Sequence, residues 1–191
     1  GKRALDIVAK APVQQSILHS RSFKETSSDV IVLRDAIAFH VREAAEDLRN
    51  MALKTSFLQV TLGTSRHGDY FLKGGSLGVH LDQPTNDTFV LLKAAGRLVE
   101  QLFDAEVPYK KAGILLSHFS PETVNQLSIF AEPRKEKTEG LMSVVDAVNK
   151  QKGRNSLLLG TYLKGDSWQS SQASQSPAYT TAWKDLAVVK A

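Results

Sequence analysis

Two amphipathic helices set among short strand patterns are the feature of this sequence that most restricts its fold. Through residues 30–48, apolar side chains recur at three- and four-residue spacing, as on one face of a helix. Residues 27–29 precede that run and offer three N-cap candidates, two serines and an aspartate. A second helix is predicted over about 85–104. Its expected apolar face consists of Phe89, Leu92, Gly96, Val99 and Phe103.

Strand patterns flank both helices. Residues 56–63 and 76–81 alternate apolar and polar side chains, which is typical of strands with one buried and one polar face. Residues 15–24 and 109–118 have strand character as well and complete the order β-α-β-β-α-β. This order predicts an α+β domain of ferredoxin-like topology. In that fold two helices cover one face of a four-stranded sheet, and the other face stays open.

The predicted strands carry cations but no carboxylates. Their charged residues are Arg21, Lys24, Lys110 and Lys111. Further polar candidates for the open face are Ser20, Ser22, Gln59, Thr61 and His80. Hydroxyls, amides and cations without carboxylates suit phosphate oxygens, so this face is a candidate nucleic-acid surface that tracks the backbone. The predicted strands lack the interleaved aromatic residues that stack on bases.

Two qualifications apply to that surface. Strands disfavour acidic residues in general, and a net charge of +4 does not by itself establish a nucleic-acid partner. Arg66 and Lys73, in the long segment that joins the second and third strands, are weaker candidates for DNA contact.

The pentapeptide QLSIF at 126–130 places three large apolar side chains in polar, turn-rich surroundings between Pro121 and Pro133. Two interpretations are open. The apolar side chains attach this linker to its own domain, or they anchor it in an apolar groove of another protein.

Five motifs together resemble the C-terminal half of UmuC-type Y-family DNA polymerases, in the family's order. They are HSRSF at 19–23, YKKAGILLSHF at 109–119, QLSIF at 126–130, LMSVVDAVNKQKGRNSL at 141–157 and SPAYTTAWKDLAVVKA at 176–191. The resemblance runs from about residue 14 to the end. It implies a linker from a preceding domain (1–13), a little-finger DNA-binding domain (14–120), a clamp-binding linker (121–133) and a C-terminal extension (134–191).

The resemblance also implies partners. The open sheet face would grip primer–template DNA during translesion synthesis in the SOS response. The clamp-binding residues would be Gln126, Leu127, Ser128, Ile129 and Phe130. In this family the C-terminal extension is associated with processed UmuD and with the recombinase filament; the alternative is that the extension packs on its own little finger. Residues 168–177, WQSSQASQSP, are richer in Ser and Gln than the family pattern and are expected to be flexible.

No catalytic centre is predicted in this chain. Polymerisation needs clustered carboxylates that hold two metal ions, and in the family these lie in an upstream palm. The sequence has no convincing carboxylate pair, no HExxH spacing and no GxxxxGK[ST] loop. We therefore expect no cofactor in this fragment and Mg²⁺ in the parent polymerase. A protein-only adaptor that uses the pentapeptide and the aromatic tail, and a small hydrolase on the same topology, are the alternatives.

The remaining expectations concern location. No apolar run approaches the roughly 20 residues of a membrane helix. The chain has no cysteine and no signal-peptide pattern, which favours a reducing cytoplasm, although the lack of cysteine also permits other compartments. The family resemblance implies the cytoplasm of a bacterium, near the nucleoid. The first residue is Gly rather than Met, so we expect a piece of a longer protein.

Overall fold

The computed structural model describes residues 14–65, 73–123, 137–153, 156–157, 168–169 and 181–182. Its elements are β1 (Ser16–Ser27), α1 (Val30–Asn50), β2 (Leu53–Thr64), β3 (Gly75–Thr85), α2 (Thr88–Leu102), β4 (Tyr109–Pro121) and α3 (Lys137–Lys152). The predicted order and the α+β class are confirmed, and each strand is longer than the sequence indicated. Of the described helices, none combines the length and the apolar character needed to cross a bilayer.

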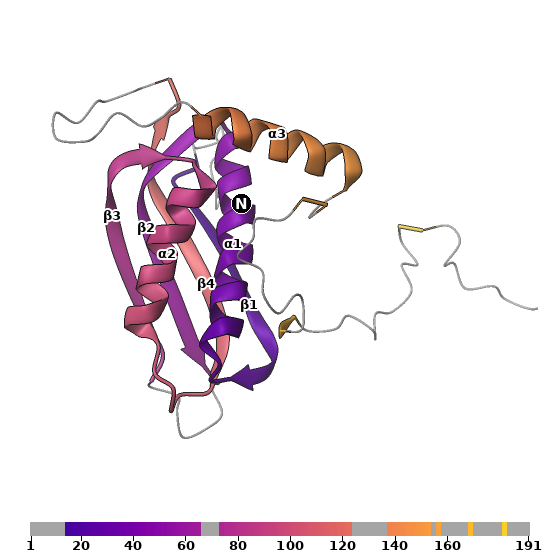
Figure 1. Ribbon diagram of the computed structural model, residues 1–191. Helices are drawn as coiled ribbons and strands as arrows, with labels where there is room; N and C mark the ends of the chain where they lie inside the picture. Colours follow the sequence, from indigo (N-terminus) through magenta and orange to yellow (C-terminus); the bar gives the residue numbers. More distant parts are fainter. Residues whose placement is uncertain are drawn as a thin grey trace, which may run out of the picture.

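Helix α1 begins where its capping residue predicts. The Asp29 carboxylate accepts a hydrogen bond from the Ile31 backbone N–H at 2.8 Å and so satisfies one of the free donors of the first turn. The apolar series that the spacing predicts is buried from Leu33 onward, with Leu33, Val41 and Leu48 fully inaccessible, and Val30 is partly buried. This long helix packs on the sheet along most of its length (Figure 1).

Helix α2 differs from its prediction in the face that it buries. Leu91, Ala95, Leu98 and Val99 are buried, whereas the side chain of Phe89 is 40% exposed. Of the predicted face only Val99 is fully buried, so the predicted phase was wrong by about one residue. Apolar residues occur around most of this helix, so its pattern alone does not select a stripe. Contact with α1 and β2 makes that selection.

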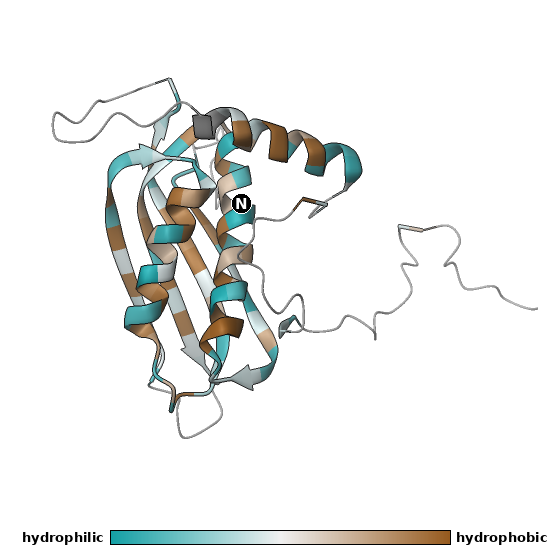
Figure 2. Ribbon diagram, in the orientation of Figure 1, coloured by the Kyte–Doolittle hydropathy of each residue, from teal (hydrophilic) through white to brown (hydrophobic). Residues whose placement is uncertain are grey.

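The four strands form one antiparallel sheet in the order β1-β4-β2-β3. Helices α1 and α2 cover one face of it, and the opposite face carries no described element (Figure 1). Apolar and polar residues alternate along the strands (Figure 2). The apolar residues that point to the helices form the core, among them Ile17, Leu58, Val60, Ile114 and Leu116.

Helix α3, in the predicted C-terminal extension, packs on the same domain. Arg49 at the end of α1 donates to both carboxylate oxygens of Asp146, from Nε at 2.5 Å and from Nη2 at 2.8 Å. Its Nη1 donates to the Asn86 carbonyl at 2.8 Å and to Thr88 Oγ1 at 3.0 Å. Met142 and Val145 of α3 are buried. For α3, the structure therefore supports the expectation that the extension packs on its own little finger.

Trp168 packs on the domain as well, where the sequence predicted flexibility. Its side chain is only 4% exposed and makes edge contacts with the rings of Phe23, Phe39 and His40. Gln169 forms an isolated antiparallel bridge to Phe23, on the outer edge of β1. The expected flexibility of this segment is therefore wrong at these two residues, because the indole fills an apolar slot between β1 and α1.

His40 lies at the base of that slot. Burial, together with the nearby charges of His19 and Arg21, lowers the pKa of His40 from 6.5 to about 4. Within the described part of the chain, neither of its ring nitrogens has a hydrogen-bond partner. The imidazole is thus held as a neutral ring among aromatic neighbours.

Candidate nucleic-acid interface

The uncovered face of the sheet is built from rows of side chains that cross the strands. Because strand residues alternate between faces, the neighbours of the core residues point away from the helices. The rows, in register, are Ser16–Ser117–Phe57–His80, Leu18–Leu115–Gln59–Gly78, Ser20–Gly113–Thr61–Ser76 and Ser22–Lys111–Gly63. No carboxylate occurs in these four rows. We call this surface the open face.

Of the two middle rows of the open face, one carries Leu18 and Leu115, and the other consists of small residues and hydroxyls. Thr61 Oγ1 and Ser76 Oγ lie 2.8 Å apart across β2 and β3. A Cβ placed on Gly113 would lie 2.5 Å from Ser20 Cβ, so β1 and β4 are in contact at this glycine. Small residues let a ligand backbone approach the sheet, and the hydroxyls supply hydrogen-bonding groups. The predicted positions of Ser20, Ser22, Gln59 and Thr61 on one face are confirmed by the register.

Basic residues gather at one end of the sheet. Lys111 is exposed on the open face beside Ser22 and Gly63. The registers of β1 and β2 against β4 both shift next to Lys111, and Lys110 Nζ there donates to the Lys24 carbonyl at 2.8 Å. Lys24 and Lys73 are exposed at the same end, the latter just before β3. The structure thus brings four of the predicted lysines to one end of the sheet.

Arg21 does not lie on the open face, and the prediction that it does was wrong. It pairs with Ala112 on the helix-covered side, where its guanidinium lies over the Phe39 ring at 6.0 Å. Its Nη1 also donates to Gln169 Oε1 at 2.6 Å. The phase of β1 decides this placement, because the buried side chains of Ile17 and Phe23 put every second residue on the covered side.

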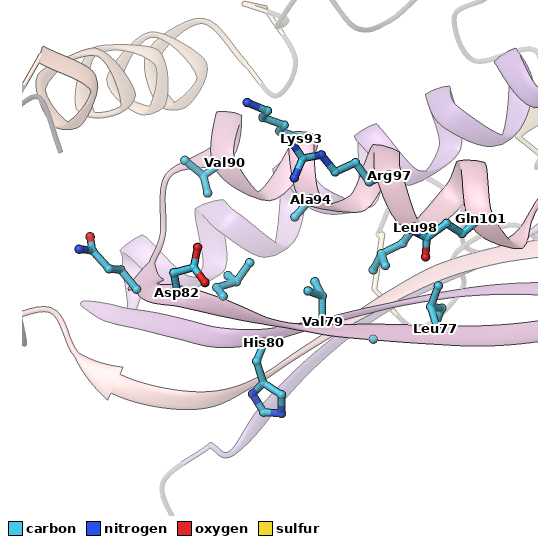
Figure 3. A pocket seen from close by; sticks show the side chains of 13 residues that line it. Leu77, Val79, His80, Asp82, Val90, Lys93, Ala94, Arg97, Leu98 and Gln101 are labelled. Carbon is cyan, nitrogen blue, oxygen red and sulfur yellow. The ribbon is translucent and has the colours of Figure 1, made fainter. Parts of the chain in front are cut away.

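The expectation that the strands lack acids is also wrong, although the open face itself is free of them. Glu25 lies in β1 and Asp82 in β3, each just beyond the end of the predicted strand. Figure 3 shows Asp82 on the same side of β3 as α2. Glu25 falls within the irregular stretch between Ser22 and Ser27, beyond the paired rows.

Three rings form a cluster at the end opposite the lysines. Ring centroids lie 4.9 Å apart for Phe57 and His80, 5.5 Å for Phe57 and His118, and 5.4 Å for the two histidines. Figure 3 shows His80 pointing away from α2. His118 has a positive φ of 56°, and its Nδ1 lies 3.1 Å from Ser117 Oγ. The expectation that this surface lacks aromatic residues was wrong.

Sequence reasoning missed this ring cluster because its members come from three different strands. Each ring is an isolated aromatic or histidine in its own segment, so no local spacing marks it. Only the register, which sets Phe57 opposite both His80 and Ser117, brings them together. Phe57 and His80 were the signals available, since the alternation in residues 56–63 and 76–81 predicted outward side chains for both.

Some predicted site residues fall outside the part that the structure describes. They are Arg66 and the pentapeptide at 126–130. In the described ranges, no group of three or more His, Asp or Glu side chains is placed to hold a metal ion.

Comparison with known families gives a direct result. The model of the impB/mucB/samB family C-terminal domain matches residues 14–129. The chain belongs to this family. A second model, a domain of unknown function (DUF4113), matches residues 139–189, which include α3. The predicted resemblance to the C-terminal part of UmuC-type Y-family polymerases, with a little-finger fold, is confirmed.

Curated relatives show the same relationship. Protein SamB of Salmonella typhimurium is 31% identical over 194 residues, which cover the whole chain and 45% of SamB. Protein UmuC of the same species is also 31% identical, with 46% of its length covered. Protein MucB of Escherichia coli is 27% identical, with 44% covered. The chain therefore spans about half the length of the curated relatives it matches.

Among solved structures, the complex of the beta-clamp processivity factor with the little finger domain of PolIV matches with a TM-score of 0.44. The identity is 14%, over 61% of this chain and 99% of that one. The insertion ternary complex of Dbh DNA polymerase matches with a TM-score of 0.41 and 18% identity, over 56% of this chain and 30% of that one.

Proposed function

We propose that this UmuC-type region grips primer–template DNA for a translesion polymerase by laying its open face against the phosphate backbone. The observation that carries the proposal is a set of four cross-strand rows without a carboxylate, with lysines gathered at one end. Phosphates dominate such contacts, since they supply most of the affinity of sequence-independent DNA binding.

The size of the open face fits this role. Four strands at about 4.8 Å spacing give a width of about 14 Å, and six residues along a strand span about 20 Å. The major groove of B-DNA is about 12 Å wide, so the face can reach phosphates on both of its sides. In this arrangement Lys24, Lys110 and Lys111, with Lys73 nearby, neutralise phosphates at one end. The ring cluster offers a π surface to a sugar or an exposed base at the other.

The test is a salt titration of DNA binding by the 191-residue chain, read by fluorescence anisotropy on a primer–template. Removing Lys24 and Lys111 together (Lys24→Ala, Lys111→Ala) is expected to lower the slope of log K against log salt by about 2, because each phosphate contact contributes about 0.9. Lys150→Ala with Lys152→Ala is the matched control, since it makes the same charge change on α3. Equal losses in both double variants contradict the proposed face. Absence of binding at low salt favours the protein-only adaptor.

We also propose that residues 126–130 tether the protein to the sliding clamp. Support comes from the family membership and from the composition of QLSIF, with three apolar anchors next to Gln126. Burying each anchor contributes about 1.5–3 kcal/mol before the cost of ordering the segment. A net free energy near −8 kcal/mol corresponds to micromolar affinity, which suits a partner that exchanges.

The clamp proposal is tested by changing Leu127 and Phe130 together to Ala. Clamp binding in a surface-immobilised assay should disappear while DNA affinity stays unchanged, because neither residue belongs to the four rows proposed to contact DNA. Ser128→Ala serves as the control within the same peptide and should bind as the unchanged protein does. Unaltered clamp affinity in the double variant overturns this proposal and leaves the DNA proposal standing.

In the same proposal, polymerisation and its Mg²⁺ belong to the upstream part of the parent protein. Binding of processed UmuD and of the recombinase filament by the C-terminal extension also stays a prediction. Any such contact would have to use parts of the extension other than the buried Met142, Val145 and Trp168.

A further inference from the structure

A groove opens between β3 and α2, on the helix-covered side of the sheet and away from the open face. Its volume is about 690 Å³. The floor is apolar and consists of Leu77, Val79, Leu81, Val90, Ala94 and Leu98. Figure 3 shows Leu77 and Val79 pointing from β3 toward the helix. A groove of this size and lining can take several side chains of a bound partner.

The strand that borders the groove, β3, is an edge strand in which the protecting residues Asp82 and Pro84 lie only within the last four positions. Residues 76–81, SLGVHL, contain no Lys, Asp, Glu or Pro, the residues that usually keep an exposed edge from pairing. Over the described residues, β3 pairs only with β2, so its outer N–H and C=O groups have no strand partner. The other edge strand, β1, carries Lys24 and Glu25, and Gln169 bridges its edge. Along residues 76–81 the edge of β3 is therefore free to pair with another strand, whereas Gln169 bridges the edge of β1.

The rim of the groove is basic. Lys93 and Arg97 lie one turn apart on α2, and both are exposed. Neither forms an ion pair with another described residue. Glu100, which is also on α2, pairs instead with Arg34 of α1. Both residues line the groove, and Figure 3 shows them extending from α2, with the Lys93 ammonium directed away from β3 and Asp82 at one end. Two cations beside an apolar floor are complementary to a binding partner that carries a carboxylate next to apolar side chains.

We propose that this groove binds an extended acidic peptide, which adds to β3 as a fifth strand. Main-chain hydrogen bonds to the free edge hold the peptide, as in other edge-strand recognition modes. Its inward side chains at positions i and i+2 are apolar and contact the floor. The next inward side chain is a carboxylate that meets Lys93 and Arg97. This site is independent of the proposed DNA contact, since the open face lies on the opposite side of the sheet.

The probe is the labelled peptide ESVSVSE. In an extended strand its valines and terminal glutamates lie on one face, and this holds whether the peptide runs parallel or antiparallel to β3. Binding to the 191-residue chain is followed by anisotropy at low salt, and amide shifts on β3 and α2 locate the site. Lys93→Glu with Arg97→Glu should weaken binding at least tenfold. The matched control, Lys150→Glu with Lys152→Glu on α3, should change it less than twofold. Ala94→Trp, which fills the groove, should also abolish binding in a chain whose circular dichroism is unchanged.

Backbone pairing has its own readout. Alternate residues of an added strand direct their N–H groups at the edge. Methylating the backbone nitrogens of the valines or of the serines should therefore abolish binding in one version and leave it in the other. The proposal is overturned if ESVSVSE does not bind, if both methylated versions bind, or if the charge-reversal and control variants lose affinity equally. A concentration-dependent dimer that Ala94→Trp abolishes would assign the edge to a second copy and overturn it too.

Discussion

The two faces of this sheet share the same four strands but differ in composition, since the covered face is apolar and the open face is mixed. On the covered face, Ile17, Leu58 and Ile114 are buried beneath the helices. On the open face, the residues next to them in sequence are Ser16, Leu18, Phe57, Gln59, Gly113 and Leu115, and the side chain of Leu18 is 68% exposed. Along each strand, residues that stabilise the core alternate with residues that form the open surface. The covered face supplies most of the stability of the fold, and exposed side chains of the open face can change at little cost to that stability.

The largest expected difference is between two neighbours on β4. Ile114→Ala removes buried methylenes beneath the helices and should lower the free energy of unfolding by about 2–5 kcal/mol. Leu115→Ala, on the open face, should cost about 1 kcal/mol or less, since its side chain is only partly buried. Urea unfolding measures both. Similar losses would mean that the open face also contributes to the core, and the contrast between faces would fail.

A second expected effect concerns pH and is confined to the covered side. The pKa of folded His40 is about 4, below its usual 6.5, so between these values the unfolded chain binds a proton that the folded chain does not. The free energy of unfolding should therefore fall as pH drops from about 6.5 to about 4. The loss attributable to this residue is about 3 kcal/mol at most.

The measurement for His40 is a series of urea unfolding curves over that pH range, compared with His40→Leu. The variant lacks the titrating ring, so its stability should depend less steeply on pH than that of the unchanged chain. Parallel curves for the two proteins would show that the pH dependence arises from other groups.

The smallest expected effects distinguish two glycines. Gly113→Ala on the open face places a methyl group 2.5 Å from Ser20 Cβ and 2.9 Å from the His19 carbonyl oxygen, so strands β1 and β4 must shift. A cost of about 1–3 kcal/mol is expected. Gly96→Ala on α2 meets nothing within 4 Å and should stabilise the helix by about 0.5–1 kcal/mol. Thermal melts of both variants test whether the open face is tightly packed between strands although nothing covers it.

Local signals in the sequence predicted the elements well. The start of α1 at Asp29, its buried stripe and the inward series of β2 follow from capping and periodicity, which depend on residues a few positions apart. The domain boundaries proposed from the family resemblance remain predictions. The lysines of the candidate DNA surface were also predicted, because three of the four lie within strands that the pattern identified.

What the sequence could not place were side chains whose position depends on distant partners. The side on which Arg21 lies follows from how β1 packs on α1. The ring cluster needs three strands in register, and the ion pair of Arg49 with Asp146 joins α1 to α3. Residues 168–169 looked flexible by composition, yet Trp168 is buried because the apolar slot that holds it is built by other segments.

By itself, then, the sequence determined the alternation of strands and helices, the fold class and the polymerase family. These follow from the periodicity of apolar residues and from sequence motifs. Only the tertiary structure decided which side chains share a face, which edge of the sheet stays free and where the cations gather. The physical reason is that strand pairing and helix packing set neighbours across long stretches of chain. A shift of one residue in that pairing would move every side chain of a strand to the other face.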